Sequence, residues 1–144
     1  MDQILQEERG MYAYEHTLDT PAPAAAVWAL YADVNGWTAW DTSLLQIDLE
    51  GPFEVGTEGT MTPEGQDTVR FRIVELVTGE LFTDETVVGE LTLRFIHRLA
   101  ETGTGTRVTH RVEITGPGAE EIGPMVASDV PDAMAALIKL AEAS

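Results

Sequence analysis

The 144-residue sequence contains no cysteine, so disulfide bridges, thiolate metal sites and a cysteine nucleophile are all excluded. It also has only 8 lysine and arginine residues against 25 aspartate and glutamate residues, which gives a formal net charge of −17. A surface this acidic repels nucleic-acid phosphates and anionic lipid headgroups, so we expect no nucleic-acid partner. An excess of negative charge of this size is typical of proteins whose charge keeps them soluble.

Long hydrophobic runs are absent as well. No run approaches the roughly 18 apolar residues that a membrane span needs, so we expect no membrane insertion. The N-terminal segment MDQILQEERG has neither the basic nor the apolar region of a signal peptide, which favours a cytoplasmic protein. We predict a flexible or short-helical tail over residues 1–10 and a single domain over residues 11–144, long enough to bury a sizeable core.

The spacing of apolar residues changes along the chain, and each change marks a group of elements. Tyr12–Leu18 alternates between apolar and polar residues and predicts a first strand. PAPAAAVWALYADV then predicts a helix begun by proline, and NGWTAWDTSL predicts a second short helix or a turn. Six strands with short turns follow, which favours an antiparallel meander. They cover residues 44–50, 57–62, 69–77, 81–88 and both arms of a hairpin that contains Phe95–Ile114.

The apolar residues return to helical spacing after Gly116-Pro117-Gly118. Residues 119–142 carry one apolar stripe and would form a helix about 36 Å long if it were unbroken. Pro131 lies inside this stretch and should kink the helix or divide it. The sequence therefore predicts an α+β fold, an antiparallel sheet with one helix-covered face. A strongly bent sheet wrapped around one long helix can leave a void between the two.

Two histidines lie among the apolar residues of the hairpin FIHRLAETGTGTRVTHRVEI. His97 shares its side of the strand with Phe95 and Leu99, and His110 shares its side with Val112. The alternate positions carry arginine and glutamate, so both imidazoles should point inward.

A two-residue turn at Gly103-Thr104 would place His97 opposite His110. The same register opposes apolar residues throughout, pairing Leu99 with Val108, Phe95 with Val112 and Leu93 with Ile114. Directly opposed Cβ atoms lie about 4.5–5.5 Å apart, so the two rings can touch.

Three interpretations of the histidine pair are open. The first is a neutral structural pair, hydrogen-bonded to each other, to the backbone or to water. The second is a polar anchor for the carbonyl or hydroxyl group of a ligand in an apolar pocket. The third is acid–base catalysis or metal binding. No cysteine or spaced histidine completes a zinc ligand set, so we expect no metal ion and no other cofactor.

Other candidate residues have two interpretations each. Asp84 could orient one of the histidines if it points inward with Phe82, and it lies in solvent in the opposite register. Trp37 and Trp40 either pack in the core or close over a ligand. For the methionines and phenylalanines we expect packing in the core, and the alternative is that they form an adaptable pocket wall.

Several segments together with the order of elements carry a family resemblance. They are AAAVWALYADVNGWTAWD, FTDET, and IHRLAETGTGTRVTHRVEITGP followed by a proline-bearing helix. These features resemble the polyketide cyclase/dehydrase-like branch of the START-related, SRPBCC superfamily, over Tyr12–Ala143. The resemblance implies a helix-grip fold, in which a curved seven-stranded antiparallel sheet wraps around a long C-terminal helix and two short helices follow the first strand. It also implies a deep, mostly apolar pocket between the sheet and that helix.

The resemblance implies a pocket between the sheet and the C-terminal helix, and we assign candidate site residues to it from the side of each strand or helix on which they lie. Aromatase/cyclases of this superfamily use arginine, tyrosine and tryptophan, but Arg70 and Arg72 alternate away from Phe71 and Ile73 toward solvent. No cyclase site is therefore carried over to this sequence. We expect the ligand to contact Trp37, Trp40, Phe53, Met61, Phe71, Ile73, Phe82, Leu93, Phe95, His97, His110, Val112, Met125, Asp129 and Met134.

Three functions follow as hypotheses. Members of the superfamily bind lipids, sterols, polyketides or other hydrophobic small molecules, which implies a carrier or sensor of a lipid, polyketide or other aromatic or isoprenoid-like compound. The alternative is a cyclase, dehydratase or isomerase that uses His97, His110 and Asp84 as acid–base groups. The third is a protein-interaction module on the same fold, without a ligand. We expect a monomer or a homodimer.

Overall fold

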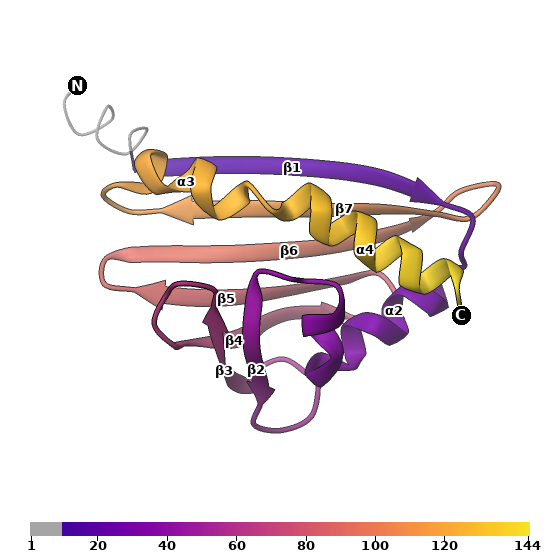
Figure 1. The fold of residues 1–144 in the computed structure, drawn as a ribbon, viewed down its shortest axis with the longest axis horizontal. Helices are drawn as coiled ribbons and strands as arrows, with labels where there is room; N and C mark the ends of the chain where they lie inside the picture. Colours follow the sequence, from indigo (N-terminus) through magenta and orange to yellow (C-terminus); the bar gives the residue numbers. More distant parts are fainter. Residues whose placement is uncertain (1–9) are drawn as a thin grey trace.

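The computed structural model describes residues 10–144, which form a curved seven-stranded antiparallel sheet with helices on one face (Figure 1). The sheet order is β1-β7-β6-β5-β4-β3-β2, so the six later strands form a meander and β1 pairs with β7. This is the predicted helix-grip fold. The strands are β1 (Met11–Thr20), β2 (Leu44–Leu49), β3 (Glu58–Pro63), β4 (Val69–Val77), β5 (Leu81–Val88), β6 (Leu91–Glu101) and β7 (Thr106–Thr115). The tail predicted over residues 1–10 falls on residues 1–9, which lie outside the described residues.

The helices come from two parts of the chain, one after β1 and one at the C-terminus. α2 (Ala24–Ala32) and the short 3-10 helix η1 (Val34–Ala39) follow β1, as the sequence predicted. The C-terminal helical region is divided into α3 (Ala119–Ala127) and α4 (Val130–Glu142). Pro131 lies in the first turn of α4, where its missing N–H costs nothing, so the predicted break falls just before it. None of the helices in residues 10–144 is long and apolar enough to cross a membrane.

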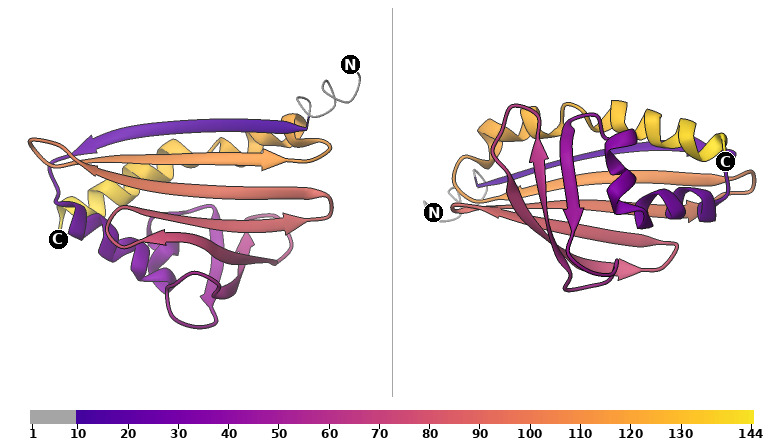
Figure 2. Two further views of the ribbon diagram at one scale, coloured as in Figure 1. Left: turned by 180° about the vertical axis from the view of Figure 1, so that it is seen from behind. Right: turned by 60° about the horizontal axis from the view of Figure 1, so that its bottom comes forward.

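The hairpin of β6 and β7 has the register that its turn predicted. His97 lies opposite His110, and the flanking inner positions pair Leu99 with Val108, Phe95 with Val112 and Leu93 with Ile114. The N–H of Thr102 donates to the carbonyl oxygen of Gly105 at 2.9 Å and closes the turn. The helices cover one face of the sheet (Figure 2). Because side chains alternate along a strand and both histidines are buried, both imidazoles point to that face.

Buried apolar residues form two clusters under the helices. The larger cluster packs α2, η1 and α4 against the sheet, and Val27, Tyr31, Phe82 and Leu137 are among its fully buried members. The smaller cluster lies where α3 covers β7, and it includes Val112, Ile114 and Ala119. The two clusters share the half-buried Val130 at the start of α4, so the break between α3 and α4 lies over the place where they meet.

A close contact between α3 and β1 depends on a glycine. Gly123 is buried inside α3, and a Cβ atom added there would fall within the ring of Tyr12 on β1. The contact involves the base of the aromatic ring, which cannot swing away as the end of a flexible side chain can. The missing side chain therefore allows α3 to lie directly on β1.

Gly123→Ala should destabilise the protein, although alanine is a better helix former by about 1 kcal/mol. The added methyl group overpacks the contact with Tyr12, which typically costs about 1–3 kcal/mol. We expect a net loss in the free energy of unfolding, measured by urea denaturation. Gly103→Ala is the matched control, because a Cβ at Gly103 meets nothing within 4 Å. An unchanged or raised stability for Gly123→Ala would contradict the contact.

Candidate functional site

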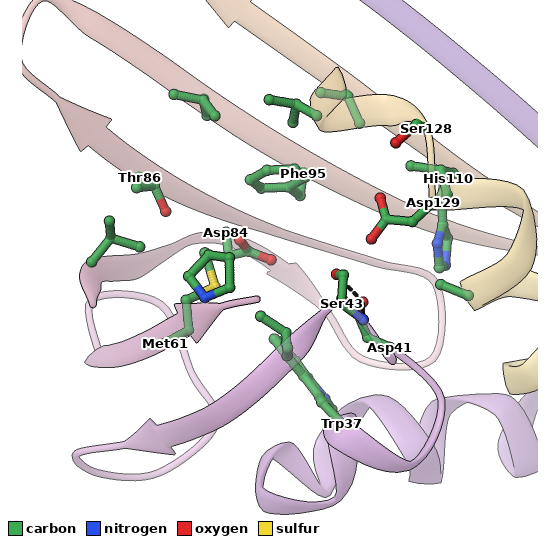
Figure 3. Close-up of a pocket in the computed structure, with 18 of the residues that line it drawn as sticks. Trp37, Asp41, Ser43, Met61, Asp84, Thr86, Phe95, His110, Ser128 and Asp129 are labelled. Atoms are coloured by element: carbon green, nitrogen blue, oxygen red, sulfur yellow. Dashed lines mark hydrogen bonds between the residues drawn. The ribbon is translucent and has the colours of Figure 1, made fainter. Parts of the chain in front are cut away.

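A cavity of about 470 Å³ lies between the inner face of the sheet and the break between α3 and α4 (Figure 3). Strands β2 to β7, the helix η1 and both C-terminal helices contribute to its wall. Its apolar lining includes Trp37, Leu44, Met61, Phe95 and Val112. The predicted void is therefore present, and members of both buried clusters line it.

The two histidines meet at this cavity. Their ring centroids are 4.6 Å apart with the planes at 75°, an edge-to-face arrangement. The ring of His97 stacks on Phe82 at 3.9 Å, and its Nδ1 lies 3.2 Å from the carbonyl oxygen of Phe82. Both histidines line the cavity and both are buried. The pair has internal partners, as in the first interpretation. It also borders the cavity, and its role as an anchor for a ligand stays a prediction.

Tyr31 is the partner of His110 that sequence reasoning missed. Its hydroxyl lies 2.7 Å from His110 Nε2, across 79 positions of sequence, and its side chain is fully buried. Burial raises the pKa of Tyr31, so the phenol stays protonated. The sequence shows Tyr31 only as an apolar-spaced residue of an alanine-rich helix, and nothing local indicates that its hydroxyl reaches β7.

Burial keeps both imidazoles neutral. It lowers the pKa of His97 from 6.5 to about 4, opposed by hydrogen bonds to the backbone at Phe82 and Phe95. Burial also lowers the pKa of His110, and the neighbouring His97 and His16 lower it further. His16 lies directly opposite His110 on β1 and is half-buried. At neutral pH the pair offers uncharged donors and acceptors.

Asp84 points inward, which settles the two orientations that the sequence left open. Its side chain is buried on the cavity wall, one inner position along β5 from Phe82. Burial and, secondarily, the charge of Asp41 raise the pKa of Asp84 from 3.8 to about 8. Asp84 is therefore mostly a neutral carboxylic acid at pH 7, able to donate a hydrogen bond.

Two more acidic residues of the wall come from outside the sheet's centre. Asp41 follows η1, and its Oδ1 accepts a hydrogen bond from Ser43 Oγ at 2.6 Å. Burial raises the pKa of Asp41, and the charge of Asp129 raises it further against the opposing effect of Ser43. Asp129 precedes α4, at the helix break. Figure 3 shows the carboxyl groups of Asp84 and Asp129 facing the same space.

Two buried polar atoms of the wall have no hydrogen-bond partner among residues 10–144. They are Trp40 Nε1 and Thr86 Oγ1, and both residues line the cavity. Buried polar groups are normally paired, so each unpaired atom at a cavity needs an explanation. A ligand group that supplies the missing partner is one.

The structure brings most of the predicted site residues to the cavity. Those that line it are Trp37, Trp40, Met61, Asp84, Leu93, Phe95, His97, His110, Val112, Met125 and Asp129. Those that pack elsewhere in the core are Phe53, Phe71, Ile73, Phe82 and Met134. Sequence reasoning did not select Asp41, Ser43, Thr86 or Ala133, which also line it. The role of any of these residues in binding stays a prediction.

Arg70 and Arg72 lie outside the site. Arg70 is exposed and forms ion pairs with Glu50 at 2.7 Å and Glu58 at 3.3 Å. Arg72 is exposed as well. Both therefore face solvent, as their alternation with Phe71 and Ile73 indicates. Among residues 10–144, no group of three or more histidine, aspartate or glutamate side chains is placed to hold a metal ion.

Asp84→Asn should change how stability depends on pH. Since the pKa of Asp84 rises from 3.8 to about 8 on folding, folding takes up a proton between these values. The free energy of unfolding should therefore fall from about pH 4 to about pH 8, relative to Asp84→Asn, on a scale of about 1.4 kcal/mol for each pKa unit. Urea denaturation across this range measures the difference, with the exposed Asp132→Asn as control. A difference that does not vary with pH would contradict a protonated Asp84.

Comparisons with solved structures find the same fold. The di-domain ARO/CYC protein StfQ of the steffimycin biosynthetic pathway matches with a TM-score of 0.81 at 12% identity, over 98% of this chain and 54% of StfQ. The chain thus spans about half the length of that protein. The Zhui aromatase/cyclase from Streptomyces sp. R1128 matches with a TM-score of 0.76 at 18% identity, over 92% of this chain and 94% of the other. Norcoclaurine synthase from Thalictrum flavum, in complex with dopamine and hydroxybenzaldehyde, matches with a TM-score of 0.71 at 16% identity, over 95% and 90%.

At these identities the structural matches show the fold alone. A comparison with curated proteins found no match. The sequence profile of a family described as "Polyketide cyclase / dehydrase and lipid transport" matches residues 11–142, nearly the whole chain. This match shows that the chain belongs to the polyketide cyclase/dehydrase and lipid transport family, and the seven-stranded helix-grip fold agrees with it.

Proposed function

We propose that the protein binds a compact, largely apolar small molecule in the cavity between the sheet and the C-terminal helices, as a carrier or sensor. The observation that carries this proposal is the cavity itself, about 470 Å³ inside a chain of 144 residues. Ligand sites usually measure about 300–1,000 Å³ and combine apolar walls with a few polar groups.

The wall suits a flat or branched apolar body. Trp37, Trp40 and Phe95 supply aromatic faces, and Met61 and Met125 supply side chains that adapt to irregular shapes. Met125 is largely exposed, so α3 places an apolar side chain at the outer side of the wall. The family description names both polyketide chemistry and lipid transport, and lipids, polyketides and aromatic or isoprenoid-like compounds are the classes we propose.

Filling the cavity should abolish binding. Ala133 lies on α4, lines the cavity and is 8% exposed, so Ala133→Phe would place a ring in the space that a ligand needs. We expect its affinity for neutral aromatic, polyketide-like and isoprenoid compounds to fall about tenfold or more, as measured by isothermal titration calorimetry. Ala135→Phe, at an exposed position of the same helix, is the matched control.

Val126→Phe, at a half-buried cavity position on α3, repeats the test if Ala133→Phe unfolds. The proposal fails if no compound of the panel binds the wild-type protein. It also fails if a folded cavity-filling variant binds as the wild type does.

A second candidate function is acid–base catalysis, which the Tyr31–His110 hydrogen bond and the protonated Asp84 favour. In an aldol-type ring closure, a base removes a proton from a carbon beside a carbonyl group. An acid delivers a proton to the second carbonyl oxygen as the new carbon–carbon bond forms, so protons balance and no co-reactant is consumed. Neutral His110 is in the protonation state that a base needs, and neutral Asp84 is in the protonation state that an acid needs.

This candidate predicts that His110→Asn lowers kcat on a linear poly-β-ketone substrate by about 100-fold or more. Tyr31→Phe removes the hydroxyl bonded to His110 and should shift the pH profile of kcat. Tyr14→Phe, at a half-buried position of β1, is the matched control. Wild-type turnover with an unchanged pH profile in both His110→Asn and Tyr31→Phe would exclude catalysis by this pair.

A further inference from the structure

The charged groups that face the cavity are acidic. Among the described residues, the carboxyl groups on its wall belong to Asp41, Glu64, Asp84 and Asp129. The basic residue on the wall is Arg111, but it lies on the outer face of β7, where it donates a hydrogen bond to Glu113 at 2.7 Å and forms an ion pair with Glu15 at 3.6 Å.

The histidines do not offset these charges, because burial lowers the pKa of both. The part of the chain that the structure describes therefore offers an anionic ligand no cation inside the cavity.

The aspartates of this wall disfavour one another's ionised forms. The charge of Asp41 contributes to the raised pKa of Asp84, and the charge of Asp129 contributes to the raised pKa of Asp41. Asp84 is only 4% exposed, and its carboxyl group receives no hydrogen bond from another side chain of residues 10–144. A single positive charge placed among these groups would stabilise all three carboxylates at once.

The unpaired atoms of the wall are a second and independent observation. Thr86 lies one inner position along β5 from Asp84, and its buried Oγ1 lacks a partner within residues 10–144. Trp40 precedes Asp41, and its buried Nε1, which can only donate, lacks a partner in the same part of the chain. Two buried polar groups without a partner thus lie next in sequence or next along a strand to the acidic ones.

The source of the positive charge follows from the geometry. A metal ion is disfavoured, because no group of three or more ligating side chains within residues 10–144 is placed to hold one. An organic ammonium needs fewer ligands, since it donates separate hydrogen bonds to carboxyl oxygens. The aromatic faces of Trp37 and Trp40 also suit an adjacent cation.

We propose that the ligand is an amine: a protonated amino group held by Asp84 and Asp41, on an aromatic or similarly flat body, with an oxygen atom that accepts from Trp40. This inference rests on the proposed function, because it names the chemistry of the molecule that the cavity binds. It separates the ligand from fatty acids, organic phosphates and other anions, which the same wall repels.

Three compounds of nearly equal size test the inference: naphthylethylamine, naphthylethanol and naphthylacetate. We expect the amine to bind about tenfold or more tightly than the alcohol, and the carboxylate to bind most weakly, in isothermal titration calorimetry near neutral pH. Asp84→Asn should remove most of the amine's advantage over the alcohol. Asp132→Asn, an exposed position on α4, controls for the loss of one negative charge.

The number of protons released on binding is a second readout, and it would not change if Asp84 had only a structural role. An ammonium group beside Asp84 favours its ionised form, so the protonated carboxyl group should release a proton when the amine binds near pH 7. Titrations in buffers of different ionisation enthalpy count that proton. We expect a value approaching one per bound amine in the wild-type protein and close to zero in Asp84→Asn.

The outcomes separate this inference from the proposed function. If the alcohol binds as tightly as the amine, or if Asp84→Asn keeps the amine's full advantage, the amine inference is overturned and a neutral ligand site remains. If none of the three compounds binds the wild-type protein and the panel of neutral compounds also fails, the proposed function falls and the amine inference falls with it.

Discussion

The pairing of β6 with β7 is the constraint on which the rest of the site depends. In the observed register His97 and His110 face each other on the inner side of the sheet. A shift of one residue would turn both imidazoles, and every apolar residue of the hairpin, toward solvent. In this register Nδ1 of His97 reaches the carbonyl oxygen of Phe82 on β5, and Nε2 of His110 reaches the hydroxyl of Tyr31 on α2. The β6–β7 hairpin therefore makes side-chain contacts both with the neighbouring strand β5 and with the helix α2.

Burial acts in the same direction on the central titratable groups of the site. It lowers the pKa values of both histidines and raises the pKa of Asp84, so all three favour their uncharged forms near neutral pH. A chain with a net charge of −17 thus encloses a cavity whose innermost groups are neutral. That combination lets an apolar body and a polar anchor coexist in one small space, since neutral groups cost far less to bury than charged ones.

The order of elements and the hairpin register could be predicted because alternation and turn length fix them locally. The orientation of Asp84 could not be predicted, because each side of β5 carries two apolar and two polar residues and either side could face inward. The sequence also could not predict which groups the inward phenylalanines contact. Phe71 and Phe82 do face the interior, but whether such a residue meets a helix or the cavity depends on where α2 and η1 settle. Tyr31 shows the same limit, because its partner lies on the last strand of the sheet.

The sheet order leaves β1 and β2 as its outer strands, and within the described residues β1 pairs on one side only. A ten-residue strand with a free row of backbone donors and acceptors is a template onto which another copy of the chain can add. The net charge of −17 opposes this for the chain as a whole. On β1 itself, Glu15 and Asp19 are paired with Arg111 and Arg107 of β7. Acid or concentrated salt removes that repulsion, so resistance to edge-to-edge aggregation is a property that the excess of carboxylates confers on this fold.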